Sequence, residues 1–193
     1  MTKPTILIDI DGVLADWQTA AILAHGLNPA GVCQRWDYIS LREPRPWSLS
    51  TVLSISDDEM WAPIYSAGHD WWVALKTFQW TMDLYETCCD IGPTYLLTSP
   101  SRDPSSHSGK AAWITKHFGK HMRDYLIGAP KHLCARPGSL LIDDRPKNCE
   151  DFIAAGGHAI MFPTIGNLLH HKRTQPLEHV AAKLDEWLAG NKP

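Results

Sequence analysis

Five short apolar runs, separated by longer segments with helical patterns, constrain the fold of this chain more than any other feature. Each run is continuously apolar rather than alternating, which is typical of strands covered on both faces in a parallel sheet. We expect strands at Thr5–Ile10, Thr94–Thr98, Asp124–Ile127, Ser139–Asp143 and His158–Phe162. This alternation of strands and helices predicts an α/β fold, a Rossmann-like parallel sheet flanked by helices, with right-handed crossovers.

Amphipathic or capped segments between these runs predict the helices. The predicted helices cover Ala15–His25, Trp71–Cys89, Gly109–Phe118, Asn148–Ala155 and an apolar stripe from Leu177 to Leu188. Ser108 precedes one of them and is a residue type that commonly caps a helix N-terminus, and Gly119 ends the same helix.

More than 80 residues separate the first expected strand from Thr94, which is too long for a single crossover. We therefore expect residues 16–80 to form a small helical cap, inserted after the first strand over the carboxyl edge of the sheet. Residues 1–15 and 81–193 would form the core domain. Ligands of open α/β sheets bind at that edge, so the cap would cover the functional site.

The charge and hydropathy of the chain exclude several classes of function. A net charge of −3 and a pI near 6.3 disfavour a nucleic-acid-binding surface. No apolar run approaches the roughly 20 residues that cross a membrane. The first expected strand begins at Thr5, which leaves no room for a signal peptide, so we expect a cytoplasmic protein. The sequence leaves open whether the chain forms a homodimer.

Pairs of carboxylates follow two of the expected strands. Asp9 and Asp11 come at the end of the first run, and Asp143 and Asp144 come at the end of the fourth. Four carboxylates at one edge of a sheet would repel one another strongly. A cation must balance them, and hard oxygen ligands favour Mg²⁺.

Hydroxyl and ammonium groups are expected near the same edge. Thr98 and Ser99 end the second strand and offer hydroxyls and backbone N–H groups. Lys131 or Lys110 could supply a positive charge. Acidic metal ligands, hydroxyl donors and a lysine together suit the binding of a phosphoryl group.

The segments DIDGVLAD, LLTSPS, a following lysine and LLIDDRP resemble the four motifs of the haloacid dehalogenase (HAD) superfamily of phosphohydrolases. Within that superfamily, DGVLADW, LLTSPS, KAAWITKHFG and LLIDDRPKN are most similar to the 5′(3′)-deoxyribonucleotidases, which remove phosphate from nucleoside monophosphates. The resemblance runs from about residue 5 to residue 150. It implies a Mg²⁺-dependent phosphomonoesterase that acts on (deoxy)ribonucleoside monophosphates through an aspartyl-phosphate intermediate.

The resemblance also implies a role for each acidic residue. Asp9 would be the nucleophile, and Asp11 would protonate the leaving oxygen and then deprotonate the hydrolytic water. Asp9, the backbone carbonyl of Asp11, and Asp144 would hold Mg²⁺. Asp143 would lie behind these ligands or exchange roles with Asp144.

The other motif residues would bind the phosphoryl group. Thr98 would donate a hydrogen bond to it, with Ser99 beside it. Lys131 follows the third expected strand and suits the position of the third-motif lysine, which would neutralise Asp9 and the phosphate. Lys110 is the alternative, because a lysine in the first turn of a helix opposes the helix dipole and hints at a function.

Tryptophans of the expected cap are candidates for contact with the base, because aromatic faces stack on nucleobases. Trp17 follows the first motif and matches an aromatic residue that contacts the base in the deoxyribonucleotidases. Trp47 and Ser48 lie near the position of another base-contacting stretch, and Trp61 is a third candidate. The cap differs from the family in length and sequence, so the base preference does not carry over.

Two alternative functions stay open. One is a HAD phosphatase that acts on another small phosphate ester or on a terminal phosphate of an oligonucleotide. The other is a catalytically idle binding protein with the HAD fold.

Overall fold

A parallel sheet forms the centre of the computed structural model, which describes residues 4–41, 45–128 and 130–190. The strand order is β3-β2-β1-β4-β5, and every neighbouring pair is parallel. The strands are β1 (Thr5–Ile8), β2 (Thr94–Thr98), β3 (Tyr125–Ile127), β4 (Ser139–Asp143) and β5 (His158–Met161). The α/β fold and the five predicted strands are confirmed, although β1 ends before Asp9 rather than at Ile10.

Side chains of the central strand β1 are buried on both faces of the sheet, which explains why the apolar runs are continuous. Ile6 and Ile8 belong to the larger hydrophobic core. Leu7 points to the opposite face, where it packs with Leu141 and Phe152.

Helices cover the two faces unequally. They are α5 (Thr81–Ile91), α6 (Ser105–Phe118), α7 (Pro146–Ala154) and α8 (Pro176–Gly190). Buried residues of α5, α6 and α8 belong to the larger core, whereas α7 supplies Phe152 to the smaller one. Among the described residues, no helix combines the length and apolarity needed to cross a membrane.

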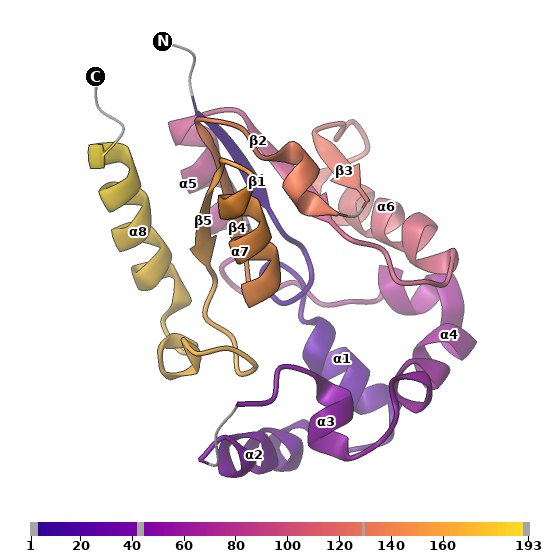
Figure 1. Ribbon diagram of the computed structural model, residues 1–193. Helices are drawn as coiled ribbons and strands as arrows, with labels where there is room; N and C mark the ends of the chain where they lie inside the picture. Colours follow the sequence, from indigo (N-terminus) through magenta and orange to yellow (C-terminus); the bar gives the residue numbers. More distant parts are fainter. Residues whose placement is uncertain (1–3, 42–44, 129, 191–193) are drawn as a thin grey trace.

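Four further helices lie beyond the carboxyl ends of the strands, as Figure 1 shows. They are α1 (Trp17–Ala24), α2 (Pro29–Ile39), α3 (Leu49–Leu53) and α4 (Asp57–Val73). This group occupies the place expected for the cap. The domain boundaries at residues 16 and 80 stay a prediction.

The single helix predicted over Trp71–Cys89 is wrong. The chain leaves α4 and passes beside the segment after β1 before α5 begins. Asp16 N donates to the Lys76 carbonyl at 2.8 Å, and Phe78 N donates to the Leu14 carbonyl at 3.0 Å. These long-range hydrogen bonds satisfy backbone groups without a helix, so the tertiary fold overrides the local apolar pattern.

The predicted start of the helix before Gly119 is also wrong. Helix α6 begins at Ser105, and Ser108 lies inside it rather than at its N-cap. The Ser108 hydroxyl donates to the Ser105 carbonyl at 3.1 Å and lies 2.8 Å from Nδ1 of His69. Lys110 is therefore in the second turn of α6, and the dipole argument for its function does not apply.

Candidate active site

Three carboxylates converge where β1 and β4 end. One oxygen each from Asp9, Asp143 and Asp144 lies within 4.8 Å of the others. The pairing of β1 with β4 brings these carboxyl ends side by side. Asp9 is 7% exposed and Asp143 is 0% exposed. Like charges this close and this buried need a cation to remain ionised together.

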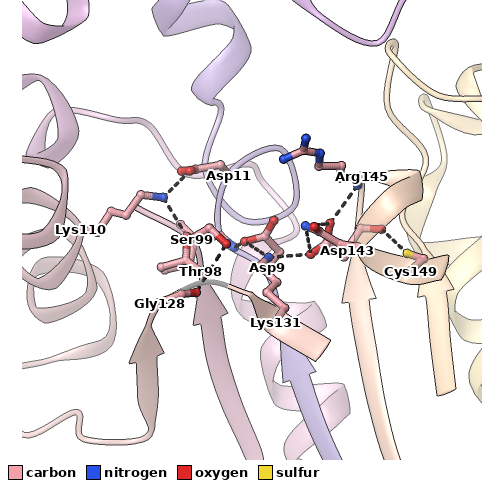
Figure 2. Close-up of polar contacts among 12 residues, drawn as sticks. Asp9, Asp11, Thr98, Ser99, Lys110, Gly128, Lys131, Asp143, Arg145 and Cys149 are labelled. Atoms are coloured by element: carbon pink, nitrogen blue, oxygen red, sulfur yellow. Dashed lines mark hydrogen bonds and ion pairs between the residues drawn. The ribbon is translucent and has the colours of Figure 1, made fainter. Parts of the chain in front are cut away.

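Lys131 supplies one positive charge to the cluster. It begins the 3₁₀ helix η1 (Lys131–Cys134), and its Nζ lies 2.7 Å from Asp9 Oδ1 and 2.5 Å from Asp143 Oδ2 (Figure 2). Burial lowers the pKa of Lys131, but the two carboxylates outweigh this effect and raise the pKa above its ordinary value. The lysine is therefore charged throughout the physiological pH range.

One lysine does not neutralise the whole cluster. Burial raises the pKa of Asp9 to about 7; Lys131 opposes this shift, whereas Asp143 and Asp11 add to it. Burial also raises the pKa of Asp144 well above its ordinary range, and the charges of Asp143 and Asp9 add to the rise. A further cation would relieve this excess of negative charge.

The two acids of the fourth motif have different surroundings. The Asp143 carboxylate accepts hydrogen bonds from Arg145 N at 2.9 Å and from Asn148 Nδ2 at 3.0 and 3.1 Å. Together with Lys131, these donors hold Asp143 behind the cavity wall. Asp144 lines the cavity, and its carboxylate has no hydrogen-bond or ion-pair partner among the described residues. The carboxylate of Asp143 is therefore held by protein donors, whereas no described residue holds that of Asp144.

The turn after β1 depends on Gly12. Its φ is +80°, a conformation that suits glycine. A Cβ at this position would lie 2.2 Å from Asp144 Oδ2. The loops that carry the first and fourth motifs thus pack directly against each other.

A second buried lysine, Lys110, serves Asp11 rather than Asp9. Its Nζ forms an ion pair with Asp11 Oδ2 and donates to Thr98 Oγ1 at 2.8 Å. It also lies 5.0 Å from the centre of the Trp72 ring. In Figure 2 the Asp11 side chain is turned toward Lys110 and away from Asp143. Asp11 Oδ1 is buried and has no partner in the part of the chain that the structure describes.

Thr98 and Ser99 lie at the end of β2, between the two lysines (Figure 2). Thr98 is fully buried, and its carbonyl accepts a hydrogen bond from Gly128 N at 2.9 Å. Ser99 lines the cavity, and its hydroxyl lies 3.5 Å from the Gly128 carbonyl.

A cavity of about 570 Å³ extends from the acidic cluster to the helices beyond the sheet. It has the size of typical small-molecule sites. The predicted site residues that line it are Asp9, Asp11, Asp144, Lys131, Ser99, Trp17, Trp47, Ser48 and Trp61. Thr98, Lys110 and Asp143 lie behind this lining rather than in it.

One wall of the cavity is a continuous aromatic surface. The ring centres of Trp17 and Trp61 are 5.5 Å apart, as are those of Trp61 and Tyr65. Trp72 stacks on Trp61 with a centre-to-centre distance of 6.5 Å. The rings leave no gap for a ligand between them, so a flat ligand would bind on the face of this wall.

Trp47 and Ser48 also line the cavity. A Cβ on Gly166 would lie 3.2 Å from the Trp47 ring, so the glycine lets this ring pack closely. Ser48 is the N-cap of α3: it accepts from Thr51 N at 3.3 Å and lies 2.7 Å from the Thr51 hydroxyl. Ser48 therefore has a structural role beside its place in the cavity.

Several cavity residues were not predicted from the sequence. They are Gln18, Trp36, Asp57, Asp58, Tyr65, Trp72, Arg102, Arg145 and Asn148. Arg145 and Arg102 lie next to recognised motifs, so their positions carried a signal. The sequence gives no such signal for the residues of the cap helices, because no motif fixes where those helices pack.

Comparison with known families decides the classification. The sequence model of the family 5′ nucleotidase, deoxy (pyrimidine), cytosolic type C protein (NT5C) matches residues 3–182. The chain belongs to this family. The predicted resemblance to deoxyribonucleotidases is therefore confirmed, and the chain is a nucleotidase-like hydrolase of phosphoric monoesters. A search of curated proteins found no significant match.

Solved structures similar to this nucleotidase-family chain share its fold. A haloacid dehalogenase-like family hydrolase from Streptococcus pneumoniae has a TM-score of 0.56 at 17% identity, over 93% of this chain and 98% of that one. The HAD-hydrolase YfnB from Bacillus subtilis, bound to magnesium, has a TM-score of 0.50 at 13% identity, over 84% and 87%. A HAD hydrolase from Entamoeba histolytica has a TM-score of 0.50 at 13% identity, over 90% of each chain.

Proposed function

We propose that this member of the NT5C family is a Mg²⁺-dependent phosphatase of deoxyribonucleoside or ribonucleoside monophosphates. One observation carries the proposal: a single cavity has an acidic cluster at one end and a continuous aromatic wall at the other. The first suits a cation and a phosphate, and the second suits a base. The cytosolic type named for the family supports a cytoplasmic location.

The acidic cluster fits a magnesium ion. Asp9, Asp144 and the main-chain carbonyl of Asp11 would hold it, with Asp143 behind them. The donors are hard oxygens, as Mg²⁺ prefers. The raised pKa values of Asp9 and Asp144 indicate an uncompensated negative charge that a divalent ion would balance. When bound, the ion would neutralise the charge on the phosphate. Magnesium in the structure of YfnB supports this assignment.

Asp9 would act as the nucleophile in two steps. Its carboxylate attacks phosphorus, the bond to the nucleoside oxygen breaks, and Asp11 donates a proton to that oxygen. Asp11 then accepts a proton from water, which attacks the aspartyl-phosphate, releases phosphate and restores Asp9. The buried Oδ1 of Asp11, which has no partner among the described residues, supports a role in proton transfer.

The two lysines, Lys131 and Lys110, would have different roles. Lys131 contacts Asp9 and would neutralise the nucleophile and the phosphate, as expected of the third-motif lysine. Lys110 contacts Asp11 and Thr98 and would position both of them. Thr98 would donate to the phosphoryl group, with Ser99, which lines the cavity, beside it.

The base would stack on the wall that contains Trp17 and Trp61, and Trp47 and Ser48, which line the same cavity, would also contact it. A cavity of about 570 Å³ with an aromatic wall suits a mononucleotide better than the end of a longer strand.

Phosphate release from a substrate panel tests the proposed function. We expect turnover of nucleoside 5′- or 3′-monophosphates with Mg²⁺ and no turnover with EDTA, because the acidic cluster repels phosphate without a cation. The panel includes sugar phosphates and a 5′-phosphorylated oligonucleotide as competing substrates. Faster turnover of either competitor would assign the cavity to a different phosphate ester. Turnover of none of them would favour the idle binding protein.

Replacing Trp17 with Ala should raise KM for nucleotides about tenfold and leave KM for p-nitrophenyl phosphate within twofold. Loss of one aromatic stack costs about 1–3 kcal/mol per base. Steady-state kinetics of both substrates check this, with Trp17→Phe as the matched variant that keeps a ring. Equal increases for the two substrates would mean that Trp17 only packs the cap.

A further inference from the structure

Asn167 is a buried polar residue outside the recognised motifs, and it lies in the loop that follows β5. It is 2% exposed. Its Nδ2 donates to the carbonyls of Phe162 at 2.8 Å and Asp144 at 2.9 Å, and lies 3.2 Å from the Thr164 hydroxyl. Its Oδ1 accepts from Leu169 N at 3.0 Å. One side chain thus joins the loop after β5 to the backbone of Asp144.

The contact with Asp144 has a particular consequence. Asp143 is fixed by donors to its carboxylate, but no described residue donates to the carboxylate of Asp144. The direction of the Asp144 side chain therefore depends on its backbone. Asn167 bonds that backbone on one side, and Gly12 packs against the Asp144 carboxylate on the other.

We propose that Asn167 is a positioning residue that orients Asp144 and thereby sets the affinity of the acidic cluster for a divalent cation. This inference rests on the proposed function, because it takes Asp144 to be a metal ligand. Groups that orient metal ligands from behind commonly change metal affinity about 10- to 100-fold when they are removed.

A purely structural role for Asn167 is the competing explanation. The same loop has a second anchor, because Arg45 Nε donates to the Ile165 carbonyl at 2.7 Å. Arg45 does not line the cavity or contact Asp144, so loosening the loop at Arg45 separates the two explanations.

The decisive measurement is metal affinity without substrate. Binding of Mg²⁺ by calorimetry and of Mn²⁺ by electron paramagnetic resonance would be compared in the wild type, Asn167→Leu, Asn167→Asp and Arg45→Met. Leu keeps the branched shape of Asn without polar atoms. Asp keeps the acceptor for Leu169 N but, when ionised, places an oxygen where Asn has its donor, against the carbonyls of Phe162 and Asp144. Circular dichroism would establish that each variant is folded.

We expect both Asn167 variants to bind either cation 10- to 100-fold more weakly, and Arg45→Met to stay within twofold of the wild type. The kcat of the two Asn167 variants should approach that of the wild type at saturating Mg²⁺, because these variants lose affinity for the metal rather than catalytic groups. Affinity within twofold of the wild type in either folded Asn167 variant, or an equal loss in Arg45→Met, would overturn the inference. If the wild type binds no cation, this result would instead refute the Mg²⁺ binding that the proposed function requires.

Discussion

Replacing Asp9 with Asn should abolish phosphatase turnover, by about 10⁴-fold or more, and leave the protein folded. The amide cannot attack phosphorus, so the covalent step has no nucleophile. Asn has nearly the same shape as Asp, and the change removes one of three negative charges that lie within 4.8 Å of each other.

The effect of this substitution on stability should oppose its effect on activity. Burial raises the folded-state pKa of Asp9 to about 7, above its unfolded value of about 4. A raised pKa makes the folded state bind more protons than the unfolded state. Asp9 therefore lowers the stability of the fold increasingly as pH rises from about 4 to 7. Asn does not titrate. The Asn variant without metal should therefore melt at a temperature equal to or above that of the wild type at pH 7.5.

Two measurements check the prediction for Asp9. Single-turnover assays with a labelled phosphate ester should trap a phosphorylated wild-type enzyme and no phosphorylated Asn variant, and thermal melts at pH 7.5 report the fold. Residual activity above about 1% of the wild type in a well-folded variant would reject Asp9 as the nucleophile, since a lost nucleophile costs far more.

The strands and the gathering of acids could be predicted because both follow from short-range rules. Continuous apolar runs identify buried parallel strands, and the carboxyl ends of such strands share one edge of the sheet. Asp9 and Asp143 each come at the end of a strand in the sequence, so topology alone places them together.

The features of the fold and the site that could not be predicted depend on contacts between distant segments of the chain. The break between α4 and α5 exists because the backbone there bonds to the segment after β1, which no local pattern reveals. Lys110 and Lys131 could not be separated by spacing, because only packing decides that one contacts Asp11 and the other Asp9. Asn167 lies outside every motif, and its partner Asp144 is 23 positions away.

Replacing Lys131 with Met should destabilise the protein by about 3–5 kcal/mol at pH 7.5 and lower turnover by about 10³-fold. Met has a similar length and no charge. The change leaves the carboxylates of Asp9 and Asp143 buried without the ammonium group that now lies 2.7 and 2.5 Å from them. Uncompensated buried charge costs more than the packing of Met returns.

The destabilisation by Lys131→Met should also depend on pH, with a definite sign. The raised pKa of Lys131 keeps the lysine charged between pH 5 and 8, whereas Asp9, with a pKa of about 7, titrates in this range. Lys131 lowers the pKa values of Asp9 and Asp144, so without it the folded-state pKa values of these two carboxyls rise further above the unfolded values. The variant therefore takes up protons on folding, and its stability falls relative to the wild type as pH rises from 5.5 to 7.5.

Urea unfolding at pH 5.5 and 7.5, without and with Mg²⁺, measures the Lys131 effect. The double variant Lys131→Met/Asp143→Asn is the matched control, because it removes one charge of each sign. It should regain most of the stability but none of the activity, since a buried ion pair can be neutralised at little cost while the reaction still lacks its lysine. Equal destabilisation of the single variant at both pH values would mean that Lys131 contributes packing rather than charge. Partial recovery of the single variant with Mg²⁺ alone would show that the ion and the lysine compensate the same buried carboxylates.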